Sequence, residues 1–415
     1  MTELPEPEER APFEPRDGVP DVITDPDALA AYARLLAQGT GPLALDAERA
    51  SGYKYSQRAY LVQLRREGAG TALIDPVPLP DLRVVQDATQ GVEWILHAAT
   101  QDLPCLAELG LQPSRLFDTE LAGRLLGRER VSLAALVQSE LGEVLEKGHG
   151  ATDWSVRPLS KAQLRYAALD VELLVELRNV MADALHEAGK DEIARQEFES
   201  LLSFEPRERG EDEWRRTSGI HRVRKPRALA VVRALWITRD EIAQDRDIAV
   251  GRILPDASII AAAQSPLSSM NDLSTLKDFH GRGAQRYLRR WWGAVAEAQD
   301  LPVAELPTGA PPPTGPPPPR SWSDRDPEAF ARLSAARSAL ADLAAAQGMP
   351  VENLMTPDTV RRLCWAPPDP ADAASVGAYL AQQGARAWQI DLTVEPLVAA
   401  LAARPAEPSD FVTDQ

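Results

Sequence analysis

The chain has 415 residues, enough for two to four domains, and its 44% hydrophobic and 26% charged content is typical of a folded protein in water. No apolar run approaches the roughly 20 residues of a membrane helix, so we expect no membrane span. The net charge of −17 disfavours general adhesion to nucleic acid but leaves room for a local basic track. Cys105 and Cys364 form no CxxC motif or disulfide framework, and we expect a cytoplasmic protein.

The first part of the chain predicts a tail followed by a mixed domain. Residues 1–20 are acidic and rich in proline, which predicts disorder. Residues 21–205 mix strand and helix patterns. Three strands are expected at LALDAE (43–48), AYLVQLRR (59–66) and TALIDP (71–76), and their close spacing predicts an antiparallel meander.

Strands and helices then alternate up to residue 205. Strand-to-helix transitions are expected at 92–99 and 115–126, a helix at 132–141, and one long helix at 160–189. Ser160, with Gln163 three residues later, predicts a capping box at the start of the long helix. The whole pattern predicts an α/β domain, a mixed sheet flanked by helices.

The second half of the chain shows only helical periodicity. We expect a basic connector at 206–227, a helical domain at 228–300, a stiff proline-rich linker at 301–322, a second helical domain at 323–404 and a C-terminal tail at 405–415. Two all-helical domains therefore follow the mixed α/β domain.

Asp46 and Glu48 stand two positions apart on the first expected strand, so both side chains point to the same face of the sheet. Two neighbouring carboxylates repel each other, and partial burial makes their ionised forms costly. A divalent cation would resolve this repulsion, and oxygen ligands suit Mg²⁺ or Mn²⁺. The alternative is a strand edge with one acid in solvent and the other in a salt bridge.

Three further residues join the set of candidates. Asp102 follows an expected strand, where it is also a plausible helix cap. Tyr166 and Asp170 are four residues apart on one face of the long helix, amid apolar residues. A buried aspartate needs a partner or a metal, and an arginine is the alternative partner.

The order of these residues resembles the DEDD exonuclease superfamily. Its pattern is D-x-E on a first strand, Asp after a later strand, and Tyr-x-x-x-Asp in a final helix, and Tyr166 corresponds to the DEDDy branch. The sister branch would have a histidine where Arg165 stands. The text TDWSVRPLSKAQLRYAALDVELL, with LVQL and LIDP earlier, is similar to ribonuclease D over residues 21–205. Many members have an asparagine where this chain has Ala98.

The resemblance implies a ribonuclease H-like fold and a metal-dependent 3′–5′ exonuclease that releases 5′-mononucleotides. Asp46, Glu48, Asp102 and Asp170 would hold two divalent cations, Mg²⁺ or Mn²⁺, and Tyr166 would orient the attacking water. The implied partner is RNA with a free 3′ end, tRNA precursors above all. We expect a monomer without an obligate protein partner.

The helical domains resemble HRDC domains, the helical domains found in RecQ-type helicases and in ribonuclease D. Residues 228–300 carry the clearer match and 323–404 a fainter one. Basic residues in the second stretch of the first helical domain and in the connector could bind phosphates, although for any one of the helical residues a solvated helix face is the commoner explanation. They are Arg222, Arg224, Lys225, Arg282, Arg286, Arg289 and Arg290. The connector could lie along RNA near the active-site entrance or serve as a flexible hinge.

Two alternatives remain beside the exoribonuclease. One is a DNA-directed 3′–5′ exonuclease, because DEDDy relatives include proofreading domains of DNA polymerases. The other is a catalytically silent scaffold that binds nucleic acid, which the presence of all four acids and the tyrosine disfavours.

Overall fold

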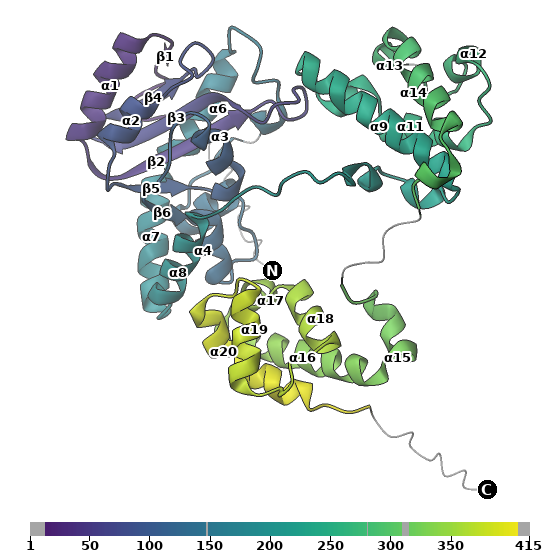
Figure 1. The fold of residues 1–415 in the computed structure, drawn as a ribbon. Helices are drawn as coiled ribbons and strands as arrows, with labels where there is room; N and C mark the ends of the chain where they lie inside the picture. Colours follow the sequence, from purple (N-terminus) through teal and green to yellow (C-terminus); the bar gives the residue numbers. More distant parts are fainter. Residues whose placement is uncertain (1–12, 147, 280, 309–314, 406–415) are drawn as a thin grey trace, which may run out of the picture.

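The computed structural model describes residues 13–146, 148–279, 281–308 and 315–405, and these fall into three lobes (Figure 1). The first lobe contains one mixed sheet of six strands in the order β1-β4-β3-β2-β5-β6. The strands are β1 (Val22–Ile23), β2 (Thr40–Arg49), β3 (Ala59–Glu67), β4 (Gly70–Ile74), β5 (Glu93–Leu96) and β6 (Arg115–Asp118). β2, β3 and β4 pair antiparallel, which confirms the predicted meander. β5 and β6 continue the sheet in parallel from β2.

Helices cover both faces of this sheet, so the expected fold class is confirmed. One face packs on α1 (Pro26–Gln38), α2 (Arg83–Ala88) and α3 (Leu103–Ala107) through a core that includes Leu43 and Leu45. The opposite face packs on α6 (Lys161–Glu172) and α7 (Leu174–Glu187). The lobe is completed by α4 (Thr119–Leu125), α5 (Leu133–Leu136), the π-helical turn Val137–Leu141 and α8 (Asp191–Leu201).

The prediction of one long helix at 160–189 is wrong in one respect, because the segment forms two helices, α6 and α7. Ser160 and Gln163 form the predicted capping box at its start. At Leu173 the backbone leaves the helical range (φ −108°, ψ 3°), which ends α6 and begins α7. α6 packs over β2, β3 and β4, whereas α7 packs over β2, β5 and α4. The break therefore lets one segment follow two different parts of the sheet.

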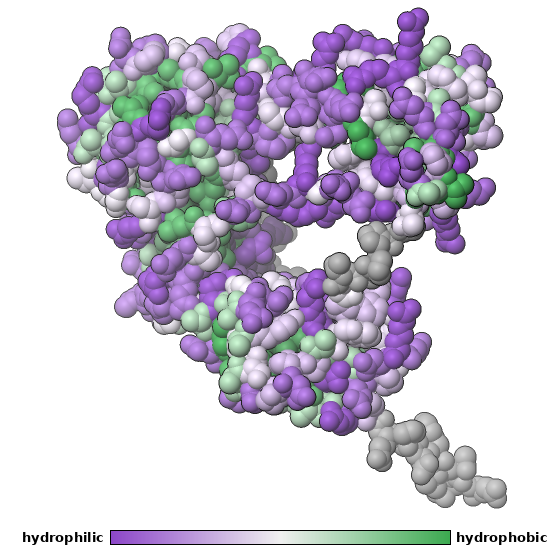
Figure 2. Space-filling view, viewed as in Figure 1, coloured by the Kyte–Doolittle hydropathy of each residue, from purple (hydrophilic) through white to green (hydrophobic). Residues whose placement is uncertain are grey.

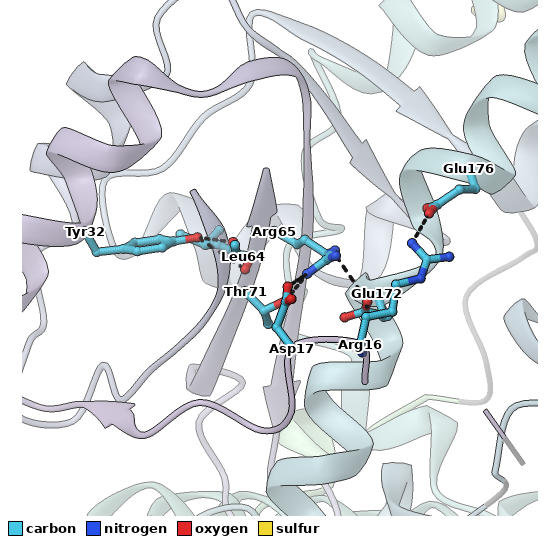
Figure 3. Close-up of polar contacts among 9 residues, drawn as sticks. Arg16, Asp17, Tyr32, Leu64, Arg65, Thr71, Glu172 and Glu176 are labelled. Carbon is cyan, nitrogen blue, oxygen red and sulfur yellow. Dashed lines mark hydrogen bonds and ion pairs between the residues drawn. The ribbon is translucent and has the colours of Figure 1, made fainter. Parts of the chain in front are cut away.

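Residues 13–20 were expected to be part of a disordered tail, but they are bound to the first lobe (Figure 3). The Arg65 guanidinium on β3 contacts the Asp17 carboxylate at 3.3 Å and the buried Glu172 carboxylate of α6 at 3.1 Å. Arg16 pairs with Glu176, and its backbone N–H donates to Glu172. The expectation of disorder fails here because the charged residues find partners on α6 and α7. Residues 1–12 lie outside the described residues.

The second and third lobes are helical, as expected. The middle lobe contains α9 (Pro226–Arg246), α10 (Val250–Ile253), α11 (Asp256–Gln264), α12 (Met270–Ser274), α13 (Arg282–Arg286) and α14 (Leu288–Asp300). The C-terminal lobe contains α15 (Trp322–Arg325), α16 (Pro327–Gln347), α17 (Val351–Leu354), α18 (Pro357–Trp365), α19 (Ala373–Gln382) and α20 (Ala387–Leu401). None of the helices among the described residues has both the length and the apolar character of a bilayer span.

The C-terminal lobe shares a hydrophobic core with the first lobe. Met349 and Trp388 pack in the same buried cluster as Phe117 and Phe198. The buried Lys190 ammonium donates to the carbonyl oxygens of Leu125 in α4 (2.5 Å) and Gln347 in α16 (2.6 Å). These two lobes therefore behave as one packed unit.

The middle lobe contacts the first lobe through the loop between β2 and β3. Asp247, directly after α9, accepts hydrogen bonds from the backbone N–H of Ser56 (2.9 Å) and the Tyr60 hydroxyl (3.3 Å). Arg252 of α10 donates to the carbonyl oxygen of Gly52 (2.8 Å). Figure 2 shows gaps between the middle lobe and the rest of the molecule on a face that is mostly hydrophilic.

The pair between Arg386 and Glu197 gives a test of the shared core. Glu197 on α8 is buried and accepts two hydrogen bonds from Arg386 (2.7 and 2.6 Å) and one from the Trp388 indole (2.7 Å). Arg386→Ala would leave this carboxylate buried without a cation, so we expect urea denaturation to give a loss of about 3 kcal/mol in the free energy of unfolding.

The matched control is Arg195→Ala, whose pairs with Glu192 and Glu199 are exposed and screened by water, so its loss of stability should be much smaller. Equal, small losses for both variants would contradict a buried contact between the lobes.

Candidate active site

β2 supplies the first two acids of the site. It lies in the middle of the sheet between β3 and β5, and its alternating residues divide between the two faces. Leu43, Leu45 and Ala47 enter the core beneath α1 and α2, whereas Ala44 packs under α7. Asp46 and Glu48 therefore project toward the face covered by α6 and α7, as the spacing predicted.

Asp102 enters the site from the turn after β5. Ala98 in this turn has a left-handed backbone (φ 60°), a conformation that asparagine and glycine adopt more readily than alanine. The buried Asp118 carboxylate accepts hydrogen bonds from the backbone N–H groups of Ala98 (3.2 Å) and Ala99 (2.8 Å) and fixes the turn. Asp102 stands at the N-cap position of α3, but its side chain makes no capping hydrogen bond. Its carboxylate is therefore not used as a helix cap.

α6 supplies Tyr166 and Asp170 from one helical face. The Tyr166 hydroxyl donates a hydrogen bond to the Asp170 carboxylate. Burial is the main cause that raises the pKa of Tyr166 above its usual value, with the charge of Asp170 next. The phenol therefore stays neutral at physiological pH and acts by hydrogen bonding.

These five side chains line one cavity of about 470 Å³. Asp46, Glu48 and Asp170 each offer a carboxylate oxygen, and the three oxygens lie within 4.8 Å of one another. Asp102 stands outside this group of three but lines the same cavity. Among the described residues it pairs with Arg49, whose Nη2 lies 3.8 Å from Oδ1 of Asp102. The alternative of carboxylates neutralised by close arginine pairs does not describe this site.

Burial raises the pKa values of the four carboxylates, and neighbouring acids raise those of Glu48, Asp102 and Asp170 further. Burial raises the pKa of Asp46 to about 6. Burial, with the charges of Asp46, Asp170 and Asp102 added, raises the pKa of Glu48 to about 10. The pKa values of Asp102 and Asp170 are also raised well above the usual range, first by burial and next by Asp46.

This donor set fits divalent metal ions. All the clustered ligand atoms are carboxylate oxygens, which suit hard cations. A bound cation would offset both the burial and the mutual repulsion that disfavour the ionised carboxylates. Protons and metal ions should therefore compete for the same oxygens.

Sequence reasoning missed two neighbours of the acids. Gln63 on β3 is fully buried opposite Asp46, and its Nε2 donates to Asp46 Oδ2 (3.3 Å). The antiparallel pairing of the first two strands could have identified it. Asp118 was also missed, although its place before a helix predicts an N-cap residue, and its carboxylate does accept a hydrogen bond from the Leu121 backbone.

The predicted nucleic-acid-binding residues form two separate groups. Arg222, Arg224 and Lys225 line a cavity of about 540 Å³ where α9 begins, together with Arg227. The second group, all exposed, is Arg282 and Arg286 in α13 with Arg289 and Arg290 in α14. The helix breaks at Tyr287, so Arg286 does not continue the helical spacing of Arg289 and Arg290. Arg290 also pairs with Glu241 at 3.1 Å.

The sequence is similar to known families along most of its length. Residues 20–186 match the family described as 3′–5′ exonuclease, residues 228–295 the HRDC domain, and residues 315–401 a 3′ to 5′ exonuclease C-terminal domain. The ribonuclease D of Cronobacter turicensis is 30% identical over 69% of this chain and 79% of its own length. That of Shewanella sp. (strain ANA-3) is 34% identical over 60% of this chain and 66% of its own length.

Solved structures show the same fold. A protein from Bifidobacterium adolescentis has a TM-score of 0.86 and 39% identity, covering 94% of this chain and 98% of its own. Escherichia coli RNase D has a TM-score of 0.67 and 24% identity, covering 92% of this chain and 98% of its own. The arrangement of all three lobes is therefore shared.

The raised carboxylate pKa values predict how stability depends on pH. A carboxylate with a pKa higher in the folded than in the unfolded state binds more protons when folded, so stability falls as pH rises from about 4 toward about 10. Glu48→Gln removes the most strongly shifted group. We expect it to raise the free energy of unfolding of the metal-free protein at pH 8 by at least about 1 kcal/mol, measured with chelator present.

Glu187→Gln, an exposed position on α7, serves as the control and should leave stability unchanged. Mg²⁺ or Mn²⁺ should stabilise the wild type more than Glu48→Gln. A variant less stable than wild type at every pH would contradict the proposed repulsion.

Proposed function

The chain belongs to the ribonuclease D family of 3′–5′ exoribonucleases, and we propose that it trims the 3′ ends of structured RNA, with tRNA precursors as the expected substrates. The observation that carries this proposal is the convergence of Asp46, Glu48, Asp102 and Asp170, with Tyr166, in one cavity. The E. coli protein of the same fold is described as an exoribonuclease involved in structured RNA processing, which agrees with this substrate class.

The proposed catalytic residues have distinct tasks. The four carboxylates would hold two divalent cations, Mg²⁺ or Mn²⁺, some directly and some through water. When bound, such ions make hydroxide available and stabilise the charge on the phosphodiester. Gln63 holds the Asp46 carboxylate in orientation through its amide. Tyr166 remains a neutral phenol, so it would orient the attacking water by hydrogen bonding instead of removing its proton.

The two basic groups suggest how a structured RNA would lie on the molecule. α9 has 21 residues, so its ends are about 30 Å apart at 1.5 Å per residue. Its C-terminal end contacts the loop beside the catalytic cavity through Asp247, whereas the connector cations stand at its N-terminal end. This separation argues against the expectation that the connector lies at the active-site entrance. We infer instead that Arg222, Arg224 and Lys225 contact the folded body of the RNA.

The second basic group lies closer to the catalytic cavity. Gly283 of α13 packs against the backbone of Arg252 and Ile253 in α10, and Arg252 in turn contacts Gly52 at the rim of the cavity. Arg282, Arg286, Arg289 and Arg290 would then contact phosphates nearer the 3′ end.

A DNA-directed exonuclease remains the alternative with the same chemistry. Matched RNA and DNA strands separate the two, because the 2′-hydroxyl is the group that distinguishes them. A silent scaffold is disfavoured because the acids and the tyrosine converge on one cavity.

The direct test of the proposed function is hydrolysis of a 3′-extended tRNA by the purified full chain with Mg²⁺ or Mn²⁺. We expect 5′-mononucleotides, no activity with chelator, and a loss of at least about 10³-fold in kcat for Asp46→Ala, because removal of a metal ligand removes transition-state stabilisation. Tyr166→Phe should retain weaker activity. Wild-type trimming by folded Asp46→Ala would refute the assignment.

A second test addresses the connector. The double variant Arg224→Ala/Lys225→Ala should bind folded RNA less tightly and reduce the slope of log K against log salt by roughly 1–2, as expected for two lost phosphate contacts. A three-nucleotide RNA should bind unchanged, since even a fully extended strand of that length is shorter than α9. Arg34→Ala, an exposed position on α1, is the charge control. Equal weakening on both RNAs would contradict a distant contact.

A further inference from the structure

Arg49 is a charged residue of the catalytic cavity that the proposed function leaves without a role. It is the last residue of β2, directly after Glu48, and its side chain is 25% exposed. Among the described residues that line the cavity, the other candidate cation is His97, and burial lowers the pKa of His97 to about 4. His97 is therefore neutral at physiological pH, and of the lining residues that the structure describes, Arg49 is the one that brings a positive charge among the acids.

The Arg49 guanidinium has unused hydrogen-bonding capacity. A guanidinium has five N–H donors. Among the described residues, Arg49 forms one ion pair, with Asp102, and its N–O distance of 3.8 Å is too long for a hydrogen bond. Arg157, which is similarly exposed, shows the contrast: its donors reach the Asp75 carboxylate and the carbonyl oxygens of Tyr60 and Trp154 at 2.5–2.8 Å. Arg157 is fixed by the fold, whereas Arg49 faces the cavity with donors available for a ligand.

We propose that Arg49 is a catalytic residue that binds a non-bridging oxygen of the phosphate being cleaved. This inference rests on the proposed function. A planar guanidinium matches the geometry of phosphate oxygens and keeps its charge at every relevant pH. The charges also balance: four ionised carboxylates balance two divalent cations, and Arg49 then balances the single negative charge of the phosphodiester. A preorganised donor at this position stabilises the charge that develops in the transition state.

A purely structural role makes a different prediction. If Arg49 served to hold Asp102, its loss would disturb a proposed metal ligand and weaken metal binding. If Arg49 binds the phosphate, its loss removes positive charge from beside the acids, so metal binding should stay equal or become tighter.

The experiment compares Arg49→Ala, Arg49→Lys and wild type on a single-stranded RNA, with Arg58→Ala as the control. Arg58 is an exposed arginine in the loop after β2 that does not line the cavity. We expect Arg49→Ala to lower kcat about 100-fold, the effect of losing one oxyanion donor, with KM changed much less. Arg49→Lys should have a kcat between those of Arg49→Ala and wild type, because lysine keeps the positive charge but lacks the paired N–H donors of the guanidinium. Arg58→Ala should match wild type.

Calorimetric titration with Mn²⁺ in the absence of RNA provides the second readout. Unchanged or tighter Mn²⁺ binding by Arg49→Ala, together with the loss in kcat, supports the proposal. Wild-type kcat in Arg49→Ala overturns it, and so does a loss in kcat that parallels weaker Mn²⁺ binding. A wild-type protein without metal-dependent hydrolysis would overturn the proposed function itself, which a failure limited to Arg49 would not.

Discussion

Electrostatic repulsion among buried carboxylates is the constraint that shapes this molecule. Asp46, Glu48 and Asp170 bring like charges within 4.8 Å of one another, and burial makes their ionised forms costly. The surrounding structure must therefore hold β2 and α6 together against the repulsion. β2 lies in the sheet interior with its apolar residues in the core, and Gln63 fixes one carboxylate from the neighbouring strand. At the C-terminal end of α6, the buried Glu172 binds Arg65 of β3 and the backbone of Arg16. The residues before β1 thus stabilise the helix that carries Tyr166 and Asp170.

The two helical lobes are attached to the catalytic lobe in different ways. The C-terminal lobe shares a hydrophobic core with α4, α7 and α8. Removal of residues 300–415 would therefore expose the apolar residues of the first lobe that pack against Met349 and Trp388. A truncation of that kind would lower stability, so single substitutions are the better test of RNA binding. The middle lobe instead contacts the loop between β2 and β3, which leads directly from the catalytic strand. A shift of the middle lobe would therefore move the rim of the cavity at Gly52 more directly than it would disturb the packing of the sheet.

The sequence predicted the parts of this structure that depend on local patterns. The meander of β2, β3 and β4, the capping box at Ser160 and the shared face of Asp46 and Glu48 each follow from the spacing of neighbouring residues. The break at Leu173 could not be predicted, because no proline or glycine marks it and packing on two parts of the sheet decides it. The bound segment 13–20 was missed for a similar reason, since acidic composition indicates disorder unless partners on distant helices are known. The strand pairing alone could have placed Gln63 beside Asp46, whereas the position of Arg49 in the cavity depends on the tertiary fold.

The ammonium of Lys190 has a consequence for how the protein can be divided. It donates hydrogen bonds to the carbonyl oxygens of Leu125 and Gln347, the last residues of α4 in the first lobe and of α16 in the C-terminal lobe. Proteolytic nicking or domain shuffling at the boundary between these lobes would leave two helix termini unsatisfied at once. Engineering that exchanges one lobe should therefore replace the middle lobe and keep the first and C-terminal lobes together as one unit.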